Sequence, residues 1–267
     1  MSDGLFSECF RQVLNWIYPR ICEICGEGPL ENASVCSSCL AALPRLPRPL
    51  CPACGGVVPG SSAEGNSCEA CKEESREFDF ARSALIYHGE LRELIMAFKY
   101  RRGLHLANSF ADLMELMMED YADRLKGVSW VLVPVPLNRK KLMRRGFNQA
   151  EELAGCLSKR WNFPVVDALL RSCDRVSQTA LDRKGRRRHV RDLYKASGSR
   201  RNHSEIEGRH VLLIDDLITT GSTANACAAI LKRELHAASV GVLTLARAVP
   251  WELLPEGMKA GKMVRMD

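Results

Sequence analysis

The sequence predicts an α/β protein with a parallel sheet, preceded in the chain by a small metal-binding domain. Two apolar runs, residues 130–136 and 211–214, are each followed by a loop and then by a segment whose apolar residues have helical spacing. Continuous apolar runs of this length are typical of parallel strands that are covered on both faces. Four Cys-x-x-Cys pairs lie in the first third of the chain. They predict metal sites there, because the apolar content of residues 20–75 is too low for a core of its own.

Length and composition are those of a globular protein with one medium and one small domain. The 267 residues include no apolar run of transmembrane length, and the first residues lack a signal-peptide pattern. We therefore expect a cytoplasmic protein without a membrane span. The net charge of +6 is uneven, since residues 135–210 hold 19 Lys and Arg against 8 Asp and Glu, a net +11. This excess favours an anionic partner.

An amphipathic helix is expected at residues 1–19, and the metal domain at residues 20–77. Each Cys-x-x-Cys turn can supply two thiolates to one metal, so the four pairs can form two closed four-cysteine sites for structural zinc. Sequential pairing is the simplest arrangement, while a cross-braced pairing stays open. An iron–sulfur or redox role is the alternative. The ligands are Cys22, Cys25, Cys36, Cys39, Cys51, Cys54, Cys68 and Cys71.

The main domain is expected at residues 78–249, before a tail at 250–267. Its expected elements, besides the two apolar strands, are a strand at 80–87, helices at 91–98, 104–120 and 150–161, a weaker strand at 163–169, a surface loop at 197–208 and a last strand at 239–245. A basic loop follows the strand at 130–136. Ligands bind at this position in open α/β sheets, past the carboxyl ends of the strands.

The most specific functional pattern is the pair Asp215 and Asp216, followed by Thr-Thr-Gly-Ser-Thr at the start of a helix. Backbone N–H groups, hydroxyls and the positive helix end can bind a phosphate there, and glycine permits the left-handed backbone of such a loop. The carboxylates would repel a phosphate, so they fit sugar hydroxyls or a bound Mg²⁺ beside it. The pattern predicts a sugar-phosphate site rather than a plain capped turn with exposed acids. The loop residues are Thr219, Thr220, Gly221, Ser222 and Thr223.

The basic loop after residues 130–136 contains Arg139, Lys140, Lys141, Arg144 and Arg145, which can hold a pyrophosphate. As a plain charge run it would be a solvated surface. Residues 171–194 are polar and cationic, and they are long for a simple connection. They fit a lid that closes over an anion, or a nucleic-acid-binding arm.

The Asp-Asp loop matches the signature of the type I phosphoribosyltransferases without a gap, and the order of all these blocks resembles the ComF family. The likeness runs from Cys22 to Arg247, and its most specific parts are the Arg-Arg-Gly-Phe-Asn-Gln block and the Asp-Asp loop. The resemblance implies a twisted, Rossmann-like parallel sheet with helices on both faces, preceded by a double zinc ribbon.

The same resemblance implies roles for individual residues. Asp215 and Asp216 would be the catalytic acids that meet the ribose of phosphoribosyl pyrophosphate, with Mg²⁺, while the Thr219–Thr223 loop holds its 5′-phosphate. His189 departs from the family, which usually has Asn after the lid arginines. The other implied contacts of phosphoribosyl pyrophosphate are Val135, Pro136, Arg139, Arg144, Arg145 and Lys99, and the implied lid residues are Arg175, Gln178, Thr179, Arg187 and Arg188.

Family members are associated with uptake and processing of single-stranded DNA in natural transformation. The resemblance therefore implies single-stranded DNA and a helicase or other DNA-uptake protein as partners. Two functions compete. One is a phosphoribosyltransferase, whose acceptor no segment of the sequence indicates. The other is a non-catalytic, single-stranded-DNA-binding or regulatory protein that uses the same pocket as a phosphoribosyl sensor.

Overall fold

The computed structural model of the chain describes residues 20–30, 33–59, 66–100, 103–119, 128–172 and 193–259. The helix expected at residues 1–19 lies outside these ranges, and so do all five predicted lid residues and His189. The expected tail is described only as far as residue 259.

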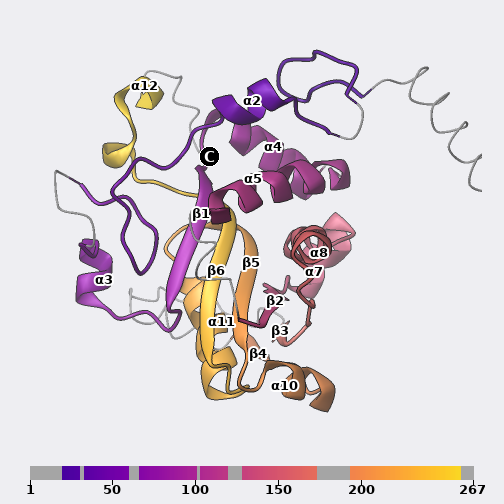
Figure 1. Ribbon diagram of the computed structural model, residues 1–267, viewed down its shortest axis with the longest axis vertical. Coiled ribbons are helices and arrows are strands. Elements are labelled where there is room, and N and C mark those ends of the chain that lie inside the picture. The colour runs from indigo at the N-terminus through magenta and orange to yellow at the C-terminus, as the bar shows by residue number, and fades with distance from the viewer. Residues whose placement is uncertain are drawn as a thin grey trace, which may run out of the picture.

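A sheet of four parallel strands forms the centre of the molecule, in the order β1-β6-β5-β2 (Figure 1). Every residue of β2 is buried, because the sheet is covered on both faces. The two strands predicted from apolar runs are confirmed as β2 and β5. The strand bounds are β1 Phe80–Ile86, β2 Trp130–Pro134, β5 His210–Ile218 and β6 Ser239–Arg247.

Helices cover both faces of this sheet. On one face, Phe98 of α4 packs edge-to-face on Phe110 of α5, with ring centroids 5.3 Å apart, above the side chains of Leu212 and Ile214. On the other face, α11 packs its alanine-rich side against Val211 and the residues aligned with it. The predicted fold class is therefore confirmed. The helix bounds are α4 Gly89–Tyr100, η1 Leu104–Leu106, α5 Ala107–Glu119, α8 Gln149–Trp161 and α11 Ser222–Arg233.

The first cysteine segment, the chain from Cys22 to Cys39 that leads into α2 (Ser37–Ala42), packs on α5 and η1 (Figure 1). The backbone N–H of Ser34 donates to Ser109 Oγ at 3.3 Å, and Ser34 Oγ donates to the carbonyl of His105 at 2.8 Å. The buried side chains of Cys22 and Val35 join the core of the sheet domain. This segment therefore draws on the large core for its stability.

The second cysteine segment, the chain from Cys51 to Cys71 that leads into α3 (Glu69–Glu73), packs against β1 (Figure 1). The backbone N–H of Ala81 donates to the carbonyl of Ala53 at 2.7 Å, and Arg82 Nη1 donates to the carbonyl of Pro52 at 3.0 Å. Gly55 has φ +67°, and a Cβ there would lie 2.3 Å from the carbonyl oxygen of Ala81. This close approach requires glycine. The boundary between residues 77 and 78 stays a prediction.

Three expectations about local structure are wrong. The surface loop at 197–208 contains helix α10 (Arg200–Ile206), because Ser199 caps it and Ile206 is buried. The basic loop contains helix α7 (Arg139–Arg145), which Asn138 caps by accepting from the backbone N–H of Lys141 at 2.8 Å. The strand at 163–169 is reduced to a parallel bridge between Leu132 and Val165. The remaining elements are β3 Leu169–Arg171 antiparallel to β4 Tyr194–Ala196, η2 Trp251–Leu253 and α12 Glu256–Lys259.

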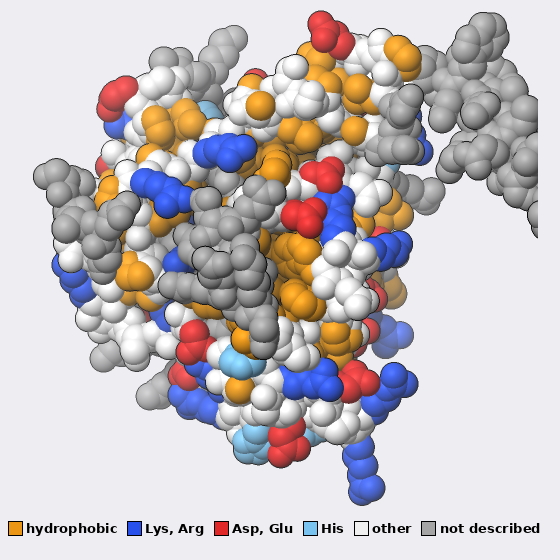
Figure 2. Space-filling model, viewed as in Figure 1, with side chains coloured by type: hydrophobic (Ala, Val, Ile, Leu, Met, Phe, Trp, Pro, Cys, Tyr) orange, Lys and Arg blue, Asp and Glu red, His pale blue; other side chains and the backbone are white. Residues whose placement is uncertain are grey.

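Within the described residues, no helix has both the length and the apolar character needed to cross a bilayer. Figure 2 shows basic and acidic side chains scattered over one face of the molecule. Among the described residues, the Lys and Arg side chains visible on this face do not form one continuous patch.

Candidate functional site

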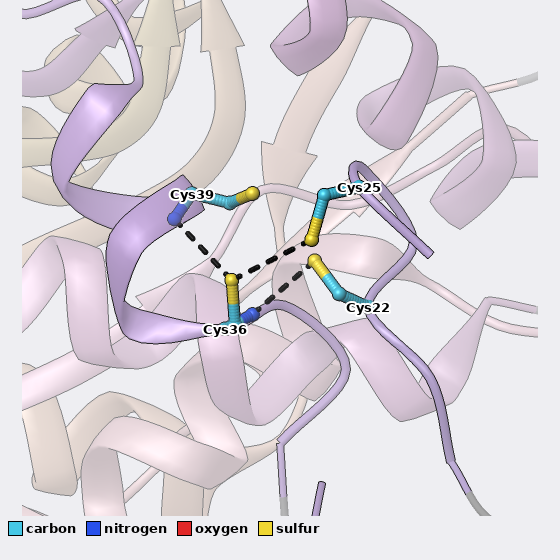
Figure 3. A group of neighbouring side chains, drawn as sticks. All are labelled: Cys22, Cys25, Cys36 and Cys39. Carbon is cyan, nitrogen blue, oxygen red and sulfur yellow. Dashed lines mark hydrogen bonds between the residues drawn. The ribbon is translucent and has the colours of Figure 1, made fainter. Parts of the chain in front are cut away.

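Eight cysteines form two groups of four, and in each group the sulfur atoms all lie within 4.8 Å of one another. Figure 3 shows Cys22, Cys25, Cys36 and Cys39 with their sulfurs turned toward a common centre. Zinc–sulfur bonds of about 2.3 Å in a tetrahedron place the sulfurs about 3.8 Å apart. The Sγ atoms of Cys25 and Cys36 are 3.8 Å apart, and those of Cys54 and Cys68 are 3.5 Å apart. The pairing is sequential, and both groups fit a closed zinc site.

Backbone N–H groups favour the thiolate form that zinc requires. Burial raises the pKa of the Cys22 thiol, but N–H donors from Cys25, Cys36 and Ile24 outweigh this effect and lower its pKa to about 6. At Cys51, burial also raises the pKa, and similar N–H donors bring it down to about 7. Each group thus contains a thiol that is prepared for metal binding near neutral pH.

Two arginines donate to the second cysteine group. Arg76 Nε donates to Cys71 Sγ at 3.5 Å, and Arg247 donates to both the carbonyl (2.7 Å) and the Sγ (3.6 Å) of Cys54. A zinc ion with four thiolates has a net charge of about −2, which two guanidinium groups balance. Neither arginine was predicted from the sequence, and Arg247 lies 193 residues from Cys54 along the chain.

The two predicted catalytic acids lie where β5 continues past the end of β2. The last paired residues are Pro134 and Ile214, so Asp215 and Asp216 begin the part of β5 that β2 does not cover. Successive side chains on a strand point to opposite faces. Asp215 lies on the α11 face, where its charge raises the pKa of Cys227. Asp216 lies on the α4 face, where it pairs with Lys99. A ligand that contacts both acids must therefore lie across the edge of β5 that β2 leaves unpaired.

Asp216 already has a cationic partner. The ammonium of Lys99, at the end of α4, forms an ion pair with Asp216 Oδ2, and the two side chains are only 14% and 11% exposed. The structure thus brings together two residues that the sequence analysis placed at one site. The fold pairs Lys99 with an acid that lies in the second half of the chain, on a different element.

Asp215 has no such partner among the ion pairs of the described residues. Burial and the neighbouring carboxylate of Asp216 hold the pKa of Asp215 well above its usual range. The backbone N–H of Asp216, which donates to Asp215 Oδ1 at 2.9 Å, opposes this shift only in part. A divalent cation or the hydroxyl groups of a sugar would suit this carboxylate.

The predicted phosphate loop, Thr219–Thr223, connects β5 to α11. Gly221 is the N-cap of α11 with φ 79°, the left-handed conformation expected for it. Thr220 Oγ1 lies 2.8 Å from Ser222 Oγ and accepts from the backbone N–H of Ser222 at 3.4 Å. Hydroxyl groups thus gather at the N-terminus of a 12-residue helix, an arrangement that suits a phosphate.

The predicted pyrophosphate residues lie next to the acids. The backbone N–H of Val135 donates to the carbonyl of Ile214 at 2.9 Å, and its carbonyl accepts from Asn148 Nδ2 at 3.1 Å. Pro136 follows, half-buried, and Arg139 is exposed at the start of α7. The loop after β2 is therefore fixed beside the unpaired edge of β5.

Tyr100 joins the two arginines at the end of α7. Arg144 and Arg145 each donate to the hydroxyl of Tyr100, at 3.3 and 3.2 Å, and their guanidinium carbons lie 5.1 and 5.0 Å from its ring centroid. The hydrogen bond from Arg145 lowers the pKa of Tyr100. Because Tyr100 follows Lys99, the end of α4 connects the Asp216 ion pair to the cations of α7. The only signal of this contact in the sequence is the clustering of these residue types.

A cavity of about 1020 Å³ opens on the other side of the phosphate loop. Its walls are the loop residues Thr219, Thr220, Ser222 and Thr223, the chain that follows β6, and the second cysteine segment. Asp215 and Asp216 are not part of its lining. The phosphate loop thus lies between the acids and this cavity.

The chain is similar to several known proteins. Residues 13–72 match the double zinc ribbon domain. Competence protein ComFC of Bacillus subtilis (strain 168) is 32% identical over 221 residues, which cover 81% of this chain and 85% of that protein. DNA utilization protein YhgH of Escherichia coli (strain K12) is 30% identical over 236 residues, 86% of this chain and 98% of that protein. A hypoxanthine phosphoribosyltransferase from Staphylococcus aureus superposes with a TM-score of 0.33 at 16% identity, over 59% of this chain and 70% of that one.

Proposed function

Because this chain belongs to the ComF family, which includes competence protein ComFC and DNA utilization protein YhgH, we propose that it binds phosphoribosyl pyrophosphate with Mg²⁺ and acts in DNA uptake. The observation that carries this proposal is the position of Asp215. Its carboxylate lies on the part of β5 that β2 leaves unpaired, four residues before the hydroxyl-rich loop at the start of α11.

The order of the elements along the sheet edge supports this ligand. The cations of α7 follow β2, the acids lie on the adjacent strand β5, and the phosphate loop follows that strand. A pyrophosphate, a ribose and a 5′-phosphate occur in the same order in phosphoribosyl pyrophosphate. The ligand would lie across the end of β5 with one charged group at each side.

Each group of the chain has a chemical role in this proposal. Mg²⁺ would supply positive charge to the leaving pyrophosphate, and its oxygen-ligand preference matches Asp215. Asp215 would also accept hydrogen bonds from the ribose hydroxyls, while Ser222 and Thr223 hold the 5′-phosphate. Arg144 and Arg145 would neutralise the pyrophosphate. Lys99 balances the charge of Asp216, so the pocket contains one unbalanced carboxylate rather than two.

Calorimetric titration of the full chain with phosphoribosyl pyrophosphate tests this proposal. We expect saturable heat in the presence of Mg²⁺ and much weaker binding when Mg²⁺ is left out, since the metal screens the charge of ligand and carboxylate. Release of pyrophosphate on addition of a nucleobase would identify a transferase. Saturable binding without release for any base would identify a sensor. Absence of heat at millimolar ligand with Mg²⁺ would refute the proposal.

The surroundings of Tyr100 favour a second candidate function, a non-catalytic protein that binds single-stranded DNA. Tyr100 is 47% exposed, with the guanidinium groups of Arg144 and Arg145 beside its ring, and Met143 next to them is 69% exposed. An aromatic face with cations suits an unstacked base and its phosphates. In this proposal the partner that delivers the strand would be a helicase or another DNA-uptake protein.

Tyr100→Ala is expected to weaken binding of an oligothymidylate about tenfold, as loss of one stacking contact does. Fluorescence anisotropy over a salt series measures this, and the affinity of the unmodified chain should fall as salt rises. Trp251→Ala is the matched control, because Trp251 is 46% exposed and follows β6. Equal affinities for both variants would exclude Tyr100 as the platform.

A further inference from the structure

We propose that the cavity beyond the phosphate loop binds a nucleoside that is attached through the ligand's 5′-phosphate. The complete site would then take a nucleotide sugar such as ADP-ribose, in which a terminal ribose and an adenosine are joined through two 5′-phosphates. This inference rests on the proposed function for the placement of ribose at Asp215 and of phosphate in the loop.

The size of the cavity is the first argument. Its volume of about 1020 Å³ reaches the upper end of the range for small-molecule sites, about 300–1,000 Å³. A single phosphate in the loop would leave most of this space to water. The cavity can hold a whole nucleoside in addition to the phosphate.

The charge of the walls is the second argument. Among the described residues of the lining, Arg76 and Arg247 are the basic side chains, and both donate to cysteines of the second group. With zinc bound, their positive charges balance the net charge of about −2 of that group. The arginines therefore leave little surplus charge to attract another free anion. The anionic part of the ligand belongs in the loop, and the rest of the cavity suits an uncharged group.

The chemistry of the remaining walls indicates a flat ring. Val57, Pro59, Val249, Pro250 and Leu253 provide apolar surface on the sides contributed by the second cysteine segment and by the chain after β6. The exposed carboxylate of Glu69 lies in the same lining and can accept from an exocyclic amine. Apolar walls with a few polar groups are typical of nucleobase and cofactor sites.

The position of the loop is the fourth argument. It borders both the acids and the cavity, whereas the acids themselves do not line the cavity. A ribose at Asp215 with its 5′-phosphate in the loop directs that phosphate toward the cavity. A substituent on the phosphate would enter the cavity, while a group on the anomeric carbon would lie on the other side of the ribose.

The test compares the affinities of ribose 5-phosphate, ADP-ribose and ADP for the zinc-loaded full chain by calorimetry. We expect ADP-ribose to bind at least tenfold more tightly than ribose 5-phosphate, and also more tightly than ADP, which lacks the terminal ribose. Ala248 lines the cavity but is not in the loop. Ala248→Phe should fill the cavity and reduce the affinity for ADP-ribose to that of ribose 5-phosphate. Leu253→Trp serves as a second filling variant should the first lose its fold, which circular dichroism would reveal.

Ala42→Phe is the control, since Ala42 is exposed at the end of α2, next to the first cysteine segment. It should leave all three affinities unchanged. Equal affinity of the unmodified chain for ribose 5-phosphate and ADP-ribose would overturn the inference and leave the proposed function standing. A tenfold gain that survives in both filling variants would also overturn it. If phosphoribosyl pyrophosphate fails to bind while ADP-ribose binds with the expected sensitivity to Ala248→Phe, the proposed function fails and the cavity assignment stands.

Discussion

Asp215→Asn is expected to abolish Mg²⁺-dependent binding of phosphoribosyl pyrophosphate and, at the same time, to stabilise the ligand-free protein. The carboxylate of Asp215 is held at the sheet edge beside another acid, and no ion pair among the described residues includes it. The amide keeps the shape of the side chain but cannot hold the metal or carry the charge. Calorimetric titration measures the loss of binding, and thermal unfolding measures the gain in stability.

The effect of pH on stability follows from the raised pKa of Asp215. The carboxyl group titrates near 3.8 when unperturbed, and burial together with Asp216 raises its pKa well above that value in the folded protein. Between these two values the folded state binds more protons than the unfolded state. The free energy of unfolding therefore falls as pH rises through this window, and the full penalty remains above the folded pKa. The advantage of Asp215→Asn over the unmodified protein should grow as pH rises and then become constant.

Asp216→Asn is the matched control, and we expect the opposite effect on stability. It would leave the ammonium of Lys99, which is 14% exposed, without its counter-charge. Removing one partner of a buried ion pair costs about 3 kcal/mol or more. Urea unfolding at pH 8 would measure both variants. If the two substitutions destabilise to the same degree, or if Asp215→Asn still binds the ligand with Mg²⁺, the distinct role assigned to Asp215 is wrong.

The features that the sequence predicted correctly depend on short stretches of chain. Strand β2 and residues 211–214 of β5 are continuous apolar runs, which is what burial on both faces requires. The fold class followed from these runs and from the helical spacing after them. The geometry of each Cys-x-x-Cys turn is also set by a few neighbouring residues. The structure shows that the turns pair sequentially and are not cross-braced.

The individual contacts that the sequence did not indicate join residues that are distant along the chain. The pair of Lys99 and Asp216 forms only because α4 ends above β5, and Arg247 reaches Cys54 only because the second cysteine segment packs against β1 beside β6. Helices α7 and α10 were taken for loops because each is seven residues long and rich in cations. Caps at Asn138 and Ser199, rather than apolar periodicity, define where they begin.

The two cysteine groups are expected to differ sharply in their effect on folding. Cys54 is 4% exposed within the core that joins the second cysteine segment to the sheet, whereas Cys25 is exposed. We expect Cys54→Ser to prevent stable folding of the whole chain. Cys25→Ser should lose one zinc and leave the sheet domain folded. Metal analysis of the purified proteins and far-ultraviolet circular dichroism would measure both effects, and the unmodified chain should contain about two zinc ions.

The reason for this difference is the charge around the second group. Without zinc or one thiolate there, Arg76 and Arg247 would face a group whose charge no longer balances theirs, at the junction of β1 and β6. The uncompensated charges and the loss of metal-binding free energy would destabilise the main core at this junction. At the first group, the loss is confined to a segment that the core residues Cys22 and Val35 still anchor. A folded Cys54→Ser protein with one zinc, as stable as Cys25→Ser, would show that the second group is as peripheral as the first.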